Sequence, residues 1–327
     1  MSLVRSGLRW LRATALEHLG VHERQRSRLD GTRAAVLMYH RVLPKAEAER
    51  LCVEPGMFVT PETFRQHLAW IRDSYRPIAL DELVTRLLDG RRLPEKAVVI
   101  TFDDGWRDNH DHALPALVES GLPATVFLAT DRVGTLGAFW PDRVSRELHR
   151  QPPGRRRRTA ARLGFTGGRD PVTGAIEALK PMAETERAEL LAHELGDDAG
   201  ANERELVTWE EVDRMARAGI AFESHGASHS ILTGLTAVDV AAELQRCRTA
   251  LAERGHGKNA IFAYPSGMND ATVRLQVRGA GFRAALTTEP RPLCVEDDSM
   301  ALPRIGVHQD VSARRAGFHR AVPGPRA

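Results

Sequence analysis

Short apolar runs of strand length alternate with longer amphipathic segments of helical period along most of the chain. The runs are rich in β-branched and aromatic residues and are apolar on both faces, which is typical of strands buried in a parallel sheet. They lie at 34–40, 97–104, 124–130, 220–225, 261–265 and 282–288, and a shorter apolar piece follows at 301–307. The pattern therefore predicts six or seven buried strands.

The segments between these runs predict helices at 60–74, 81–90, 114–121, 208–219, 236–255 and 269–281. Their ends carry the expected signals. Thr60 and Thr208 stand at N-cap positions, Pro61 occupies a first helical position, and Gly90 follows the last periodic residue of its segment.

Repeated strand-then-helix order indicates an α/β fold with a parallel sheet, either a barrel or a doubly wound sheet. In both architectures, chemistry gathers at the carboxyl ends of the strands. The rhythm breaks at about 135–205, a stretch that is rich in arginine and punctuated by Gly and Pro. We expect it to be an insertion that caps or flanks the site, within one domain that spans 31–308 and ends in a tail at 309–327.

Residues 1–30 form a separate pattern. Apolar residues at helical spacing, with arginines between them, predict an amphipathic helix, and the arginines interrupt any core of a secretory signal. The helix either packs on the domain or lies on an anionic membrane face. No stretch is apolar enough to span a membrane. We therefore expect a cytoplasmic protein, or one that is peripheral at the inner face of the membrane.

The net charge is only +3, so the composition does not indicate nucleic-acid binding. A run of four arginines, Arg155 to Arg158, is expected to be a solvated loop, and contact with anionic lipid or glycan is the alternative. The three cysteines are widely spaced and odd in number, which argues against a disulfide framework and favours a reducing compartment.

Polar groups stand at the ends of several predicted strands. They are His40, Asp103, Asp104, His225, Tyr264 and Pro265, with His229 four residues after His225. One aspartate oxygen and two imidazole nitrogens suit a divalent metal such as zinc, and three protein ligands leave positions open for water and substrate. The second aspartate of the pair can then take a proton from water, because a nearby cation stabilises its negative charge.

Each of these groups also has a simpler interpretation when taken alone. His18 and His22 have the same spacing as His225 and His229, yet no strand precedes them. His40 alone would more often be a hydrogen-bonded core histidine. Joint placement at strand ends is what favours a metal site.

Four motifs resemble those of the polysaccharide deacetylases with a NodB homology domain, carbohydrate esterase family four. They are LMYHRV at 37–42, TFDDG at 101–105, SHGASH at 224–229 and FAYPSG at 262–267. The resemblance covers residues 34–308 and implies a distorted (β/α) barrel of about seven strands. It also implies metal-dependent hydrolysis of N-acetyl groups on sugars. The early LMYHRV is typical of the subgroup that resembles poly-N-acetylglucosamine deacetylases.

Carried over to this chain, the resemblance makes Asp103 the catalytic base and makes Asp104, His225 and His229 the ligands of one divalent metal, with zinc expected. The subgroup makes His40 the first choice for the general acid, and His308 is the alternative.

Two positions depart from the family pattern. Gly226 stands where the family usually has Ser or Thr, and FAYPSG lacks the arginine that commonly precedes its proline. Arg304 is the candidate to orient Asp103 instead. Tyr264, Pro265 and Ser266 are expected to contact substrate, with the backbone N–H of Ser266 near the oxyanion.

The function that follows is a metal-dependent hydrolase that removes N-acetyl groups from amino sugars of a poly- or oligosaccharide. Two alternatives stay open. One is an esterase that acts on O-acetyl groups of a glycan with the same site. The other is a glycan-binding relative with weak turnover. In each case the partner is a carbohydrate.

Overall fold

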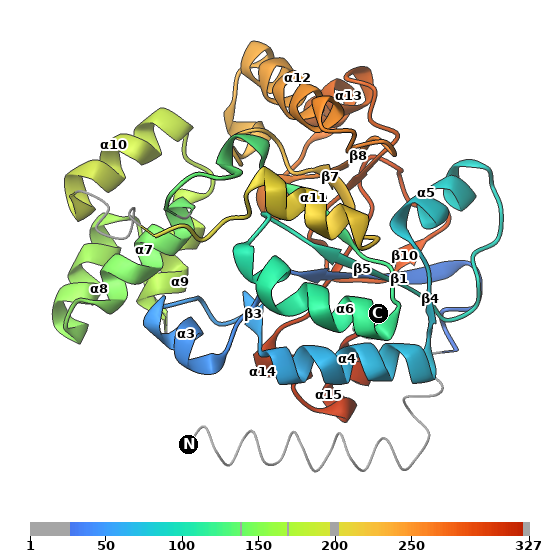
Figure 1. Ribbon diagram of the computed structural model, residues 1–327. Coiled ribbons are helices and arrows are strands. Elements are labelled where there is room, and N and C mark those ends of the chain that lie inside the picture. Colours follow the sequence, from blue (N-terminus) through green and yellow to red (C-terminus); the bar gives the residue numbers. More distant parts are fainter. Residues whose placement is uncertain (1–26, 138, 169, 197–202, 323–327) are drawn as a thin grey trace.

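The computed structural model describes residues 27–137, 139–168, 170–196 and 203–322. A curled sheet lies at its centre, helices cover the outside of the sheet, and a group of helices stands to one side (Figure 1). The predicted N-terminal helix lies outside the described residues, except for 27–30, which are not helical. The strands of the sheet are β1 Arg33–Tyr39, β4 Arg76–Pro77, β5 Ala97–Phe102, β6 Thr125–Leu128, β7 Ala221–Ser224, β8 Ile261–Ala263, β9 Ala284–Leu286, β10 Leu293–Cys294 and β11 Ile305–Gly306.

Seven strands follow one another in the order β10-β1-β5-β6-β7-β8-β9 and curl into a half-barrel. The pairs from β1 through β9 are parallel, and β10 runs antiparallel to β1. Every residue of β5 is buried, as its uninterrupted apolar run predicts. The α/β fold with about seven strands in a distorted barrel is confirmed.

The segment 302–306 links β9, at one end of this order, to β1, the second strand from the other end. Leu302 forms a parallel bridge with Leu286 of β9, and Ile305 of β11 pairs with Leu37 of β1. The chain therefore returns to the first strand late, and it carries Arg304 between these two pairings.

The amphipathic segments form helices as predicted, and their caps explain where they begin. The Thr60 hydroxyl accepts a hydrogen bond from the Thr63 N–H, and Thr208 forms a capping box with Glu211. Helix α4 buries Phe64, which contributes about 1.5–3 kcal/mol. These helices are α4 Pro61–Ser74, α5 Leu80–Leu88, α6 Leu114–Ser120, α11 Trp209–Arg217, α12 Ala237–Glu253 and α13 Ala271–Gly279.

Smaller elements complete the barrel. β2 Arg41–Val42 and β3 Phe58–Val59 form a two-stranded sheet beside α3 Lys45–Arg50. A π-helical turn at Asn109–Ala113 leads into α6. Short 3₁₀ turns occupy Thr130–Arg132, Leu232–Gly234 and Pro265–Gly267.

The insertion is a helical unit with a core of its own. Its helices are α7 Trp140–His149, α8 Pro153–Arg162, α9 Pro171–Leu179 and α10 Glu184–Leu195. Val144, Leu163, Ile176 and Leu191 meet in one buried cluster. Figure 1 shows these helices beside the sheet, next to α3.

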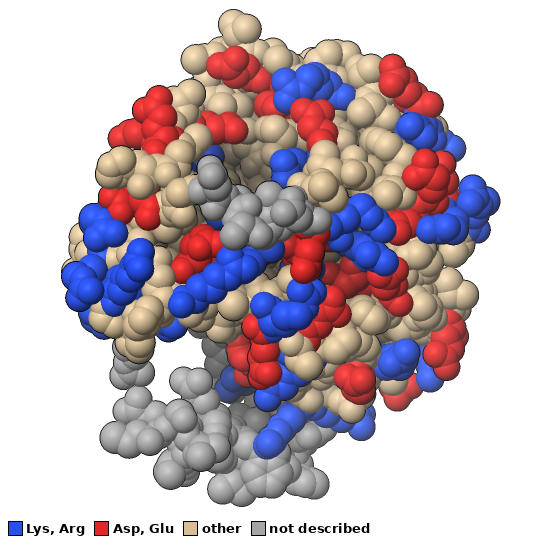
Figure 2. All heavy atoms as spheres, turned by 60° about the vertical axis from the view of Figure 1, so that its left-hand side comes forward, with Lys and Arg blue, Asp and Glu red and all other residues tan. Residues whose placement is uncertain are grey.

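The four arginines from Arg155 to Arg158 lie on α8, so the prediction of a loop is wrong. Arg155, Arg157 and Arg158 are exposed, as expected of solvated residues. The helix forms because Pro153 stands at its first position and Thr159 and Ala160 pack inward. The face that Figure 2 turns forward carries several Lys and Arg side chains at its left edge.

Residues 309–322 are not a tail. They form α14 Gln309–Ser312 and α15 Arg315–Ala321, which pack against α4. His67 of α4 donates from Nε2 to the Ser312 carbonyl at 2.8 Å, and its ring stacks on Phe318 with centroids 4.5 Å apart. The domain therefore extends past residue 308. Among the described residues, no helix has both the length and the apolar character needed to cross a membrane.

Candidate active site

The three predicted metal ligands converge at the carboxyl ends of β5 and β7. Nε2 of His225 lies 3.3 Å, and Nε2 of His229 lies 3.2 Å, from Oδ1 of Asp104. One possible ligand atom from each residue lies within 4.8 Å of the others. Asp104 and His225 are buried, and His229 is 12% exposed. The cluster is thus compact and reachable from one side.

The tautomer of His225 indicates which kind of ligand the cluster can hold. Nδ1 of His225 lies 2.8 Å from the carbonyl oxygen of Ala263, which can only accept, so Nδ1 carries a proton. In the neutral ring, Nε2 then presents a lone pair toward an oxygen of Asp104. Two lone pairs repel at 3.3 Å unless a proton or a cation lies between them. A carboxylate and two imidazoles in this arrangement fit a divalent metal, and the Ala263 carbonyl orients a ligand ring as such sites require.

Backbone geometry aims two of these ligands. Asp104 and His229 adopt left-handed conformations, with φ of 77° and 72°. Such conformations cost non-glycine residues roughly 1–3 kcal/mol and occur where surrounding contacts hold them. The indole N–H of Trp106 donates to the other oxygen of Asp104 at 2.8 Å. Gly226 also has a left-handed φ, of 80°, which gives a physical reason for glycine in the SHGASH turn.

Asp103 is held by Arg304, as predicted. Burial alone would raise the pKa of Asp103, but the charge of the Arg304 guanidinium, together with nearby histidines, holds this pKa below its usual value. Burial likewise acts to raise the pKa of Asp104, while contacts with His225 and His229 hold it well below the usual range. Both carboxylates are therefore ionised at neutral pH.

His40 and His308 differ in their surroundings. His40 follows β1, and burial lowers its pKa while the charges of Asp104 and Asp103 raise it. The net result is a pKa below the usual value. His40 and Asp103 follow the paired residues Tyr39 and Phe102 of neighbouring strands. His308 follows β11 and lies 3.5 Å from Asp310 through Nδ1. No pKa shift of Asp103 or Asp104 has His308 among its main causes.

The segment from Tyr264 to Ser266 ends β8. The side chain of Tyr264 is buried among apolar residues, and its hydroxyl donates to the Met300 carbonyl at 2.9 Å. This side chain therefore packs in the core. Pro265 begins a turn in which Ser266 has a left-handed φ of 56°.

Several supporting residues escaped the sequence analysis. Glu243 of α12 accepts hydrogen bonds from the Ala227 and Ser228 N–H groups, both at 3.0 Å, and so holds the loop between the two histidines. Phe139, from the insertion, lies 4.4 Å from the His229 ring. Trp106 directly follows the TFDDG motif, but nothing in the sequence links Glu243 or Phe139 to the histidines.

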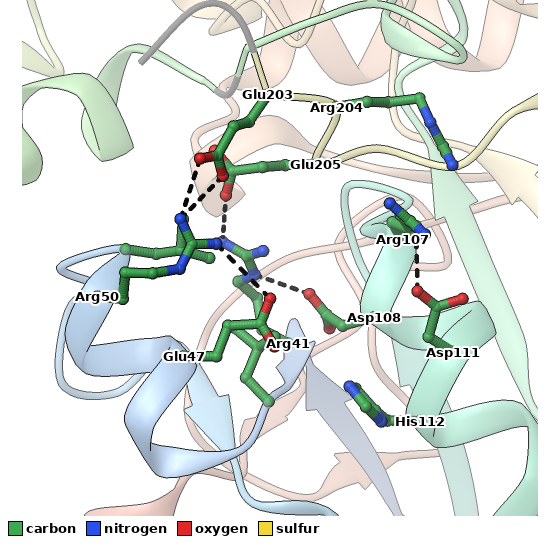
Figure 3. A pocket seen from close by; sticks show the side chains of 12 residues that line it. Arg41, Glu47, Arg50, Arg107, Asp108, Asp111, His112, Glu203, Arg204 and Glu205 are labelled. Carbon is green, nitrogen blue, oxygen red and sulfur yellow. Dashed lines mark hydrogen bonds and ion pairs between the residues drawn. The ribbon is translucent and has the colours of Figure 1, made fainter. Parts of the chain in front are cut away.

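A charged pocket of about 310 Å³ lies beside this centre. Figure 3 shows Arg41 reaching Asp108 and Glu205, and Arg50 reaching Glu203. The Arg41 guanidinium also lies 4.0 Å over the ring of Trp106, the residue that donates to Asp104. One wall of the pocket is therefore linked through a single indole to the cluster of Asp104, His225 and His229.

Comparisons with known proteins agree with this geometry. YxkH of Bacillus subtilis strain 168, assigned by name to the polysaccharide deacetylases, is 23% identical over 285 residues, which cover 87% of this chain and 75% of that protein. A poly-β-1,6-N-acetyl-D-glucosamine N-deacetylase of Staphylococcus epidermidis is 28% identical over 134 residues. That match covers 38% of this chain and 46% of the relative, so less than half of the relative's length is compared.

A solved structure shares the fold. The Streptococcus pyogenes deacetylase PplD, in complex with acetate, superposes with a TM-score of 0.60 at 17% identity. The match covers 89% of this chain and 98% of that chain. The family model for polysaccharide deacetylases matches residues 90–285, more than half of the sequence and including Asp103, Asp104, His225 and His229. The chain belongs to the polysaccharide deacetylase family.

Proposed function

We propose that this deacetylase is metal-dependent and removes N-acetyl groups from amino sugars of a poly- or oligosaccharide. The observation that carries the proposal is the pairing of two functions at one strand end. Asp104 joins His225 and His229, while its neighbour Asp103 is held apart by Arg304. A metal ligand and a base are thus supplied side by side.

The metal would be one divalent ion, with zinc expected from the mixed nitrogen and oxygen ligands. When bound, such an ion polarises a carbonyl oxygen and lowers the pKa of water. Asp104 supports this role because the histidine contacts hold its pKa low, so it is an anion across the neutral range.

Asp103 acts as the general base. It is ionised, and each of its oxygens keeps a lone pair beyond the one that Arg304 occupies. The carboxylate can therefore accept a proton from the attacking water while the guanidinium fixes its orientation. Arg304 is a positioning residue in this scheme, because it acts through Asp103.

His40 donates the proton that the departing amine needs. An amine leaves poorly as an anion, so hydrolysis of an amide requires an acid near the nitrogen. His40 directly follows Tyr39, which pairs with Phe102, the residue before Asp103. Burial lowers the pKa of His40, and the charges of Asp104 and Asp103 oppose this by favouring the protonated ring. His308 is the competing candidate. The backbone N–H of Ser266, at the end of β8, is proposed as an oxyanion donor.

The substrate is proposed from kinship and chemistry together. The relative in S. epidermidis acts, by its name, on poly-β-1,6-N-acetyl-D-glucosamine. We propose that an N-acetylglucosamine polymer of this type is the substrate of the present chain. An O-acetylated glycan is the second candidate, since the same residues could hydrolyse an ester that needs no protonation of an amine.

The test is acetate release from matched N-acetylated and O-acetylated glycans, measured before and after metal removal and with zinc or cobalt restored. Metal-dependent release from the N-acetylated glycans supports the proposal. Release from O-acetylated glycans alone makes the protein an esterase. Binding of glycans without any release makes it a glycan-binding relative.

A further inference from the structure

The insertion reaches the metal-ligand cluster at the start of α7. Phe139 is the residue before this helix. The centroid of its ring lies 4.4 Å from that of the His229 ring and 5.3 Å from that of the Trp106 ring. Phe139 is buried in a small cluster that includes Trp106 and Leu206. The first turn of α7 is therefore fixed against the side of the catalytic centre.

Asp142 lies in this first turn and is half-buried. Among the described residues, its carboxylate makes no hydrogen bond or ion pair. The charged groups that act on its pKa are Arg41, Glu205, Asp104 and Arg146. Burial raises the pKa of Asp142 to about 7, with Arg41 opposing this and Glu205 and Asp104 adding to it. On α7, Asp142 stands between Phe139, whose ring packs on that of His229, and Arg146, which donates to Glu205 in the wall of the charged pocket.

The residue that would ordinarily pair with Asp142 is engaged elsewhere. Arg146 stands four residues later on the same face of α7, the spacing at which an aspartate and an arginine form an ion pair. Its Nη1 instead donates to Glu205 at 2.8 Å, and Glu205 also accepts from Arg41. Nε and Nη2 of Arg146 are buried without a partner among the described residues. Within the described part of the chain, this helix face therefore holds a half-buried carboxylate and two buried guanidinium nitrogens without partners.

Unpaired buried polar groups are costly, and they are expected where a ligand completes them. A sugar hydroxyl both donates and accepts, so it can satisfy a carboxylate and a guanidinium at once. Because this face lies next to a proposed metal ligand, the part of the substrate bound there must be close to the reacting acetyl group.

We propose that α7 forms a sugar-binding subsite of the catalytic centre, in which the Asp142 carboxylate accepts a hydrogen bond from a hydroxyl of the bound glycan. The inference rests on the proposed function and deepens it, because it assigns part of the substrate recognition to the insertion. Asp142 is then a specificity-determining residue, and Arg146 and Phe139 position its helix.

The test compares Asp142→Asn with the unmodified protein on an N-acetylated oligosaccharide and on a small aryl acetate. Asn keeps the shape of the side chain and removes the charge. We expect kcat/KM on the oligosaccharide to fall about 10- to 100-fold, as for loss of a hydrogen bond to a charged group. The loss on the aryl acetate, which has no sugar, should be at least tenfold smaller. Glu189→Gln, an exposed carboxylate on α10 of the same insertion, is the matched control and should change neither value.

Two results would overturn the proposal. One is an unchanged kcat/KM on the oligosaccharide, and the other is an equal loss on both substrates, which would indicate damage to the metal centre. Direct binding of the oligosaccharide to Asp103→Asn, with and without Asp142→Asn, separates this inference from the proposed function. If the unmodified protein releases no acetate, the proposed function fails, yet weaker binding caused by Asp142→Asn still supports the subsite. Equal binding by the two variants, or none by either, contradicts it.

Discussion

Arg304 and Asp103 lie 201 residues apart in the sequence, yet each terminal nitrogen of the guanidinium donates to a different carboxylate oxygen, both at 2.6 Å. The arginine side chain is fully buried and that of the aspartate is 2% exposed. Nε of Arg304 donates to the Thr287 carbonyl, which fixes the plane of the guanidinium group. The carboxylate of Asp103 is therefore oriented by a charge that has no contact with solvent.

Replacing Arg304 with Gln should destabilise the protein by about 3–5 kcal/mol, because it leaves the buried carboxylate of Asp103 without a counter-charge. The free energy of unfolding in urea measures this. The double variant Asp103→Asn with Arg304→Gln should recover much of the loss, since no buried charge is then left unpaired. An additive loss in the double variant would mean that the pair is not coupled.

His225→Ala should strip the metal while leaving secondary structure intact. Only one imidazole and one carboxylate remain, and two ligands hold a divalent ion poorly. Elemental analysis after dialysis measures the content. His193→Ala, which removes an exposed histidine of the insertion, is the control and should leave the content unchanged. Full metal content in His225→Ala would place the ion elsewhere.

Asp103→Asn should keep the metal and lose turnover by about 10²–10⁴-fold, the usual contribution of a positioned general base. Asn preserves the shape of the side chain and cannot take the proton. Steady-state acetate release, read together with metal content, tests this. Activity within a few-fold of the unmodified protein would assign the base to another residue.

His40→Ala should slow amide substrates far more than esters with good leaving groups, because the latter need little protonation on departure. The ratio of the two rates is the measurement, since a general structural defect would lower both together. His308→Ala should then be nearly silent. The reverse pattern, with His308→Ala selective for amides, would exchange the two roles.

His67 should make the stability depend on pH. Burial lowers its pKa to about 4, against about 6.5 in an unfolded chain. Between these values the unfolded chain binds a proton that the folded protein does not. Stability is therefore full above about pH 6.5 and falls by about 3 kcal/mol as the pH drops through about 4.

His67→Gln tests this linkage. Its amide can donate to the Ser312 carbonyl and accept from the Tyr39 hydroxyl, as the imidazole does, but it does not titrate. Urea unfolding at pH 7 and pH 4.5 should show a smaller difference for this variant. His193→Gln, on the exposed surface, should leave the difference as it was.

The clustering of Asp104, His225 and His229 could be predicted because its signals are local. Asp104 and His225 each follow a buried strand directly, and the carboxyl ends of parallel strands meet at one edge. Arg304 was a less direct prediction, since it depended on noticing that FAYPSG lacks an arginine. The buried orientation of Tyr264 could not be read from the motif, because a strand end gives no information on which face a side chain takes.

The helices at 309–322 were missed because their pattern is weak. Helix α14 has only four residues, and Phe318 is the one large apolar residue of α15. What holds them is a contact with His67, far away in the sequence, and such partners leave no periodic trace. The arginine run on α8 was read as a loop for a similar reason, since its inward residues, Thr159 and Ala160, are small.

The segment at 302–306 has a consequence for the order in which the folding chain assembles its candidate active site. Synthesis delivers β5 and β7 to the growing chain well before Leu302 and Ile305, so Asp104, His225 and His229 can come together before Arg304 has been made. During that interval Asp103 has no guanidinium beside it, and no segment yet joins β9 to β1. The same late segment that joins β9 to β1 also supplies the partner of Asp103, so this carboxylate becomes oriented only in the step that links the two strands.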